Sequence, residues 1–193
     1  RAFGNSYIQR FTIPPNLKKI CEYAFYSCKE LKIIEMPSNS KLKTIEKCSF
    51  ALSSIESFII PESLTDLQNG WCIMTPKLTE ICVSPKNPRY ITYDDGKILI
   101  GKSSFESENY DNLVFCVRNI KYAKIPSFIE HICDNAFENC DQLQKIIIPS
   151  DSVLQTIGKN AFSNSSIESF KIPFSLKIIK EYAFSECHKL RNI

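Results

Sequence analysis

The sequence has little of what most enzymes and nucleic-acid-binding proteins require. Only 5 of its 193 residues are glycine, which argues against an enzyme fold that cradles phosphate. The net charge of +3 is small, and acidic and basic residues alternate without a basic tract, so nothing points to nucleic acid. No apolar run among these residues is long enough to cross a bilayer, and none of them has the pattern of a signal peptide. The two histidines, His131 and His188, stand apart from any repeated polar pattern, so we expect neither catalysis nor a cofactor.

Cysteine, in contrast, is abundant, with nine residues and no C-x-x-C pair to indicate a zinc site. Cys28, Cys140 and Cys187 share one position of the repeat described below, so the favoured interpretation is a ladder of small, buried side chains. A disulfide among Cys72, Cys82 and Cys116 is an alternative. Metal or redox chemistry is a third interpretation, for which no ligand spacing is present.

The chain repeats itself. Phenylalanines head successive units at spacings of 22 and 25 residues, and each is followed by an apolar pattern that closes on proline. The phenylalanines are Phe3, Phe25, Phe50, Phe137, Phe162 and Phe184. Both ends of the chain interrupt a unit, so we expect the repeats to belong to a longer array. Shifting the chain by 112 residues superimposes residues 1–81 on 113–193 without a gap. The predicted organisation is one solenoid with a first block at 1–81, an insertion at 82–118 and a second block at 119–193.

The spacing within a unit predicts strands. In L-x-x-I-x-I-P the last two apolar residues alternate as in a strand with one buried face, and the proline ends the ladder. A return segment such as Leu154–Ile157 adds two inward residues, and a tight turn carries Ala-Phe. Because a unit this short cannot close a core alone, we expect units to stack. In the fourth unit Gly70-Trp71-Cys72 replaces Ala-Phe, and we expect Trp71 to fill the volume of the missing phenylalanine.

The pattern resembles the leucine-rich repeats of the BspA-like (Treponema-type) family. Gly158-Lys159-Asn160-Ala161-Phe162 and Ala136-Phe137-Glu138-Asn139-Cys140 carry the resemblance most closely. It implies a curved, β-rich solenoid with a parallel sheet on its concave side and short strands, turns or 3₁₀ segments on its convex side. The glycine of the family pattern is Cys21, Glu46, Cys133 or Lys180 in other units, so this turn must tolerate side chains.

The segment between the blocks predicts a β-meander. Residues 87–100 resemble two strands around the Asp94-Asp95-Gly96 turn, and 112–117 a third strand. Calcium binding at this turn is a weaker interpretation, because the alternating oxygen ligands of an EF-hand are missing.

The concave face is the candidate site. The third and fifth positions of L-x-x-I-x-I point outward and mix apolar with charged residues, which suits a protein-binding surface. A simpler explanation is that β-branched residues favour strands. The second block is the more basic, so an acidic partner or a glycan is conceivable there. The candidate residues are Arg10, Ile33, Glu35, Ser57, Ile59, Glu80, Tyr122, Lys124, Lys145, Ile147 and Lys171.

The resemblance implies a function in adhesion, because BspA-like proteins are typically surface-exposed in bacteria and in parasitic protists such as trichomonads. We therefore predict a non-enzymatic module at the cell surface or outside the cell that binds host or matrix proteins. An intracellular, cytoplasmic scaffold on the same solenoid is the alternative. Asn164-Ser165-Ser166 is a sequon for N-glycosylation, although the register turns Ser165 inward and so hinders attachment at Asn164.

Overall fold

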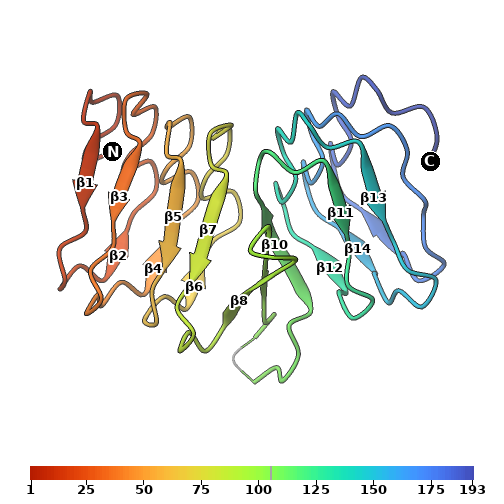
Figure 1. Ribbon diagram of the computed structural model, residues 1–193, viewed down its shortest axis with the longest axis horizontal. Coiled ribbons are helices and arrows are strands. Elements are labelled where there is room, and N and C mark those ends of the chain that lie inside the picture. Colours follow the sequence, from red (N-terminus) through yellow and green to blue (C-terminus); the bar gives the residue numbers. More distant parts are fainter. Residues whose placement is uncertain (105) are drawn as a thin grey trace. The chain divides into compact units, whose positions relative to one another are not determined.

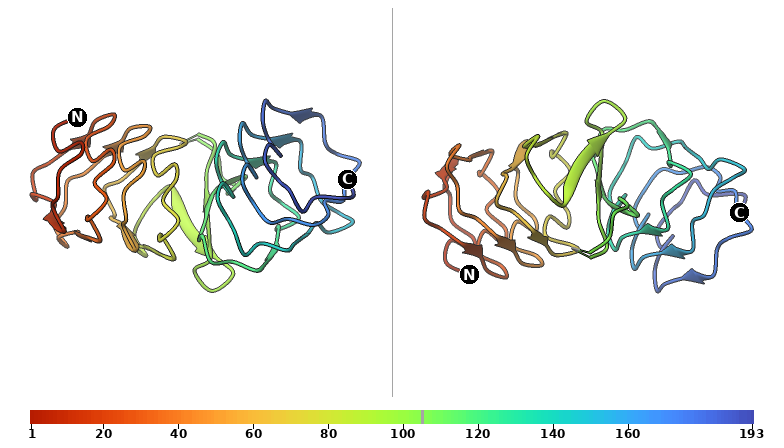
Figure 2. Two further views of the ribbon diagram at one scale, coloured as in Figure 1. Left: turned by 90° about the horizontal axis from the view of Figure 1, so that it is seen from above. Right: turned by 90° about the horizontal axis from the view of Figure 1, so that it is seen from below.

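The computed structural model describes residues 1–104 and 106–193 and divides into two compact units, Arg1–Thr92 and Tyr93–Ile193. In each unit the backbone winds through successive turns that stack side by side (Figure 1 and Figure 2). The regular elements of the described residues are short strands, and no helix occurs among them. The predicted fold class, a β-rich repeat solenoid with parallel sheets, is confirmed.

The first unit carries two rows of parallel strands. Figure 1 shows the longer strands in chain order. In this row β1 (Arg10–Thr12) pairs with β3 (Ile33–Glu35), and β5 (Ser57–Ile60) pairs with β7 (Glu80–Val83). The return strands form one sheet of β2 (Lys19–Ile20), β4 (Thr44–Ile45) and β6 (Asp66–Leu67). A backbone hydrogen bond of 3.1 Å from Glu56 to Lys32 joins the third turn to the second beside the longer strands. The first three repeats therefore each contribute one long and one return strand, as the apolar spacing predicts.

The second unit repeats this arrangement. Its longer strands β11 (Tyr122–Lys124) and β13 (Lys145–Ile147) pair in parallel, and single bridges extend the row to Ser169 and Asn192. The return row contains β12 (His131–Ile132), β14 (Thr156–Ile157) and β15 (Ile178–Ile179).

In the chain, the predicted meander follows the long strand β7 and precedes the long strand β11. The strands β8 (Tyr90–Tyr93) and β9 (Ile98–Gly101) flank a turn in which Asp94, Asp95 and Gly96 adopt positive φ. The strand β10 (Asn112–Cys116) pairs antiparallel with β9 and parallel with β12. β10 thus joins the meander to the return row of the second unit.

The core of each unit is a ladder of phenylalanine rings. In the first unit Phe25 stacks on Phe3 and Phe50 at centroid distances of 5.2 and 5.0 Å. In the second unit Phe162 stacks on Phe137 at 4.9 Å and on Phe184 at 5.1 Å. Each ring therefore buries both faces only when its neighbouring repeats are folded.

In the fourth repeat the aromatic ring comes from the residue before the usual phenylalanine position. Residues with positive φ flank Phe50 at Cys48 and Leu52, and at the same spacing Gly70 and Met74 flank Cys72. Cys72 thus takes the backbone position of phenylalanine. Trp71 is nevertheless buried and packs on Phe50 and Phe58 at 5.9 and 4.9 Å, so its ring fills the expected volume.

The turn before Ala-Phe accepts side chains because they bind the preceding turn. Glu46 accepts a hydrogen bond of 2.9 Å from the backbone N–H of Glu22, and Gln68 accepts one of 3.2 Å from that of Lys47. Gly158 has no such side chain, and Asp134 of the previous turn instead accepts from the N–H of Lys159 at 2.8 Å. The turn therefore tolerates side chains in place of glycine, as the sequence predicts, because Glu46 and Gln68 form hydrogen bonds with the preceding turn.

None of the nine cysteines forms a disulfide, and the ladder interpretation holds for Cys28 and Cys140, which are fully buried. The thiol of Cys28 donates to the carbonyl of Phe3 at 3.0 Å, and the half-buried Cys187 repeats this contact with Phe162 at 3.0 Å. The hydroxyls of Ser6 and Ser165 lie 3.5 Å from these two sulfur atoms. Cysteine and serine thus alternate as small groups that close successive turns.

Thiol labelling should separate these cysteines by exposure. Cys21 is exposed and is expected to react first with a maleimide, whereas Cys28 and Cys140 react only after unfolding. Partial burial and the Glu80 carboxylate raise the pKa of the exposed Cys82, so its reaction at neutral pH is slower than that of Cys21. Glu80→Gln removes a negative charge that disfavours the thiolate, and should accelerate Cys82 alone. Mass spectrometry of a labelling time course measures this order, and labelling of Cys28 as fast as Cys21 would contradict it.

Candidate interaction face

The longer strands expose alternate side chains on one face of each unit. We call these the first long-strand face, on β1, β3, β5 and β7, and the second long-strand face, on β11, β13 and the bridged Ser169 and Asn192. All the candidate residues are exposed except Glu35 and Ser57, which are half-buried. Their large apolar members have exposed fractions of 40% for Ile33, 45% for Ile59, 58% for Tyr122 and 43% for Ile147. Their part in binding remains a prediction.

The first long-strand face mixes charge pairs with isoleucine. Arg10 lies opposite Ile33, and its guanidinium reaches Glu35 at 2.5 Å, one position along the face. Hydrogen bonds from Thr12 and Arg10 lower the pKa of the Glu35 carboxyl. Farther along, Ile59 lies opposite Cys82. The exposed isoleucines of this face therefore alternate with polar groups.

The second long-strand face is cationic. Register places Tyr122 opposite Lys145, and Lys124 opposite Ile147. The Tyr122 hydroxyl donates to the side chain of Gln144 at 3.0 Å, which fixes the ring at the edge of this face. Sequence reasoning missed Asn192, which the bridge to Ser169 places in the same row. Asn192 lies in the short last segment of the sequence, which is too short to show the complete L-x-x-I-x-I pattern.

Beside the return strands the surface carries charges that neutralise each other, although the last of these strands, β15, also exposes Ile178 and Ile179. Lys19 pairs with Glu46 at 2.6 Å and Lys47 with Glu22 at 3.1 Å in the first unit. In the second unit Lys180 pairs with Asp134 at 3.3 Å. The hydrogen bond from Lys19, with that from the Glu22 backbone, lowers the pKa of Glu46. These solvated pairs contribute little to stability. Because each charge already has a partner within the chain, this surface offers few unpaired charges to a binding protein.

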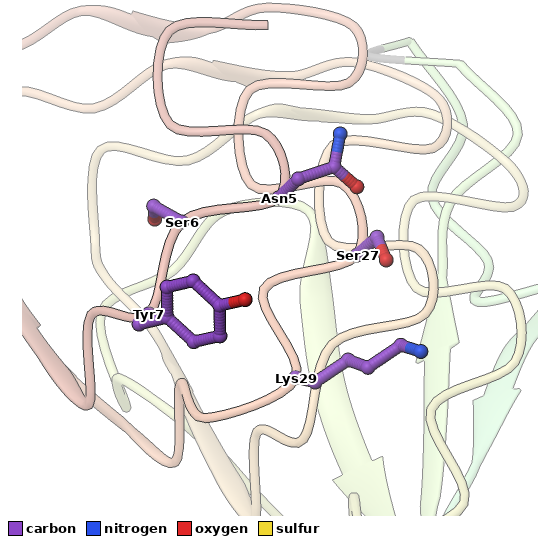
Figure 3. Close-up of a pocket in the computed structure, with 5 residues that line it drawn as sticks. All are labelled: Asn5, Ser6, Tyr7, Ser27 and Lys29. Carbon is purple, nitrogen blue, oxygen red and sulfur yellow. The ribbon is translucent and has the colours of Figure 1, made fainter.

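Two polar hollows occur in the first unit away from these strands. One, of about 190 Å³, lies between the first two turns, and Figure 3 shows the side chains around it, which are Asn5, Ser6, Tyr7, Ser27 and Lys29. The other lies at the corners after the long strands, beside Ser40, Ser63 and Lys86. The hydroxyl of Ser63 in this hollow donates to the carbonyls of Ser40 and Leu42, so it links adjacent turns of the solenoid.

The remaining sequence candidates occupy separate places. Asn164 is exposed in a turn with positive φ, while Ser165 is buried, so the sequon stays a prediction. Asp94 pairs with Lys97 at 3.9 Å within the hairpin turn. Within the described part of the chain, no group of three or more His, Cys, Asp or Glu side chains is arranged to hold a metal ion. Nor does that part contain a helix able to span a membrane.

Solved structures with the same fold include two bacterial proteins. The pneumococcal vaccine antigen PcpA matches with a TM-score of 0.81 and 22% identity, over 99% of this chain and 51% of its own. A leucine-rich cell surface protein of Faecalibacterium prausnitzii A2-165 matches with a TM-score of 0.73 and 22% identity, over 95% of this chain and 52% of its own. The chain thus spans about half the length of these proteins. At this identity the likeness establishes the fold.

Among curated protein sequences, none matches the chain. A family model does: the model of the BspA-type leucine-rich repeat region (six copies) matches residues 1–109 and again residues 108–193. The match covers both units and the meander between them. It confirms the resemblance drawn from the Ala-Phe turns and the L-x-x-I-x-I-P strands. The chain belongs to the BspA-type leucine-rich repeat family.

Proposed function

We propose that the chain is a non-enzymatic protein-interaction module whose two long-strand faces bind partner proteins. The observation that carries the proposal is the contrast between the faces of the solenoid. The long-strand faces expose Ile33, Ile59, Tyr122 and Ile147. Beside the return strands charges pair with each other, and exposed isoleucines occur there on the last strand, β15. Exposed apolar side chains among polar ones are typical of surfaces that lose water on binding.

The proposed setting is adhesion at the cell surface, with host or matrix proteins as partners. It is supported by family membership and by the vaccine antigen and the cell surface protein that share the fold. The intracellular scaffold remains the second candidate, and nine cysteines without a disulfide favour it, because oxidising compartments promote disulfides.

Charged substitutions on the second long-strand face test the proposal. Tyr122→Asp combined with Ile147→Asp should weaken binding to a panel of immobilised extracellular-matrix proteins by about 30-fold, since the two apolar contacts together are worth about 2 kcal/mol. Both side chains point to solvent, so thermal unfolding and circular dichroism should be unchanged. Surface plasmon resonance gives the affinities.

A matched control lies in the same unit. Phe128 and Val153 have exposed fractions of 48% and 43%, outside the long strands, and their double replacement by Asp should preserve binding. Equal losses in both double variants would contradict the assignment to the long-strand face. If the unaltered chain binds no matrix protein, adhesion to matrix is wrong and the intracellular scaffold is favoured.

A further inference from the structure

Three lysines surround an exposed isoleucine on the second long-strand face. Lys124 lies directly opposite Ile147 in the strand register. Lys145 precedes Ile147 by two residues on β13, so both point to the same side of the sheet. Because Lys145 bridges to Ser169, Lys171 falls in the next strand position beside Ile147. Tyr122, opposite Lys145, completes a surface with cations around an apolar centre.

The three lysines are available to a ligand. None of Lys124, Lys145 and Lys171 takes part in an ion pair among the residues that the structure describes, and all three are exposed. Glu168 precedes Ser169 in the adjacent row, and Arg191, the aligned residue of the following turn, offsets its charge. On the first long-strand face, in contrast, Arg10 is neutralised by Glu35. The second face therefore keeps an uncompensated positive charge.

We propose that the second long-strand face binds an acidic protein segment, in which carboxylates flank an apolar side chain. The carboxylates contact Lys124, Lys145 and Lys171, and the apolar side chain covers Ile147 beside the Tyr122 ring. This inference rests on the proposed function and names the class of partner for one of its two faces.

The spacing of the groups fits an extended segment. Neighbouring strands are about 4.8 Å apart and alternate residues about 6.8 Å, so Lys145 lies roughly 8 Å from its diagonal neighbours Lys124 and Lys171. Alternate carboxylates of an extended peptide are about 7 Å apart, and the flexible lysine side chains accommodate the difference. The apolar centre favours a peptide over a sulfated glycan, because sugars offer no large aliphatic side chain to cover Ile147.

A short fluorescent peptide tests the inference on the complete chain. The peptide carries aspartates on both sides of a central leucine, and its controls replace either the aspartates with asparagine or the leucine with serine. We expect the acidic peptide to bind best, both controls to bind more weakly, and added salt to weaken its binding. Fluorescence anisotropy measures the dissociation constants.

The variant Lys145→Glu combined with Lys171→Glu should weaken binding of this peptide at least about tenfold, because two attractive contacts become repulsive. Its control is Lys41→Glu combined with Lys43→Glu, which makes the same change of charge at exposed residues of the first unit and should leave binding unchanged. Tighter binding of heparin than of the peptide, or equal binding of the asparagine peptide, would overturn the inference. If Tyr122→Asp with Ile147→Asp abolishes matrix-protein binding while the lysine variant retains it, the proposed function stands and the acidic partner is wrong.

Discussion

Phe162→Ala is expected to lower the free energy of unfolding by about 3–5 kcal/mol, the usual range for removing a fully buried phenylalanine ring. Phe162 is completely buried and stacks on Phe137 at 4.9 Å and on Phe184 at 5.1 Å. Phe170 packs against the same ring at 5.5 Å. The cavity would thus open between three repeats, and a repeat protein depends on the contacts between neighbours. Equilibrium denaturation in urea measures the loss.

Phe174→Ala is the matched control, because this ring lies in the same unit and is fully exposed at 110% of the reference area. Its replacement should change the free energy of unfolding by no more than about 0.5 kcal/mol. Similar losses for both variants would mean that the phenylalanine ladder does not stabilise the second unit.

Gly158→Ala is expected to cost about 1–3 kcal/mol, the range for overpacking a closely packed site. A Cβ atom at Gly158 would lie 2.5 Å from the backbone nitrogen of Asp134 and 2.6 Å from the carbonyl carbon of Cys133. Because both atoms belong to the backbone of the preceding turn, that turn has to move, and the hydrogen bond of 2.8 Å from Gly158 to Ile132 is strained. Thermal unfolding monitored by circular dichroism reports the change.

Gly4→Ala provides the comparison. A Cβ at Gly4 would lie 3.4 Å from that of Arg1 and 3.6 Å from two carbonyl oxygens, which are ordinary contacts. The variant should therefore be neutral or gain up to about 1 kcal/mol from the reduced entropy of the unfolded chain. A stable Gly158→Ala protein would show that the second unit can widen the spacing between these turns at little cost.

The regular repeats were predictable because their side-chain pattern and their packing follow the same period. The alternation in L-x-x-I-x-I-P placed the long strands, and the phenylalanine spacing placed the ladder that the structure contains. The Asp94-Asp95-Gly96 turn located the hairpin, since few sequences tolerate consecutive residues with positive φ. Outward positions of the candidate face followed from the same alternation.

Irregular positions were less predictable. That Cys72 takes the register of phenylalanine while Trp71 supplies the ring depends on the path of the backbone between Gly70 and Met74. The use of Glu46 and Gln68 to bind the preceding turn depends on how closely the turns stack. Neither relation has a local signature in the sequence.

The sequence by itself determined the repeat, the family and the alternation of buried and exposed positions, because each depends on residues that are close in the chain. Only the tertiary structure decided which charges neutralise each other. Lys19 and Glu46 are distant in the chain, but stacking brings them to 2.6 Å, whereas Lys124, Lys145 and Lys171 remain without carboxylate partners in the described structure. Coulomb energy depends on distance in space and on exposure to solvent, so the contrast between the paired return strands and the cationic long-strand face appears only when the turns are stacked.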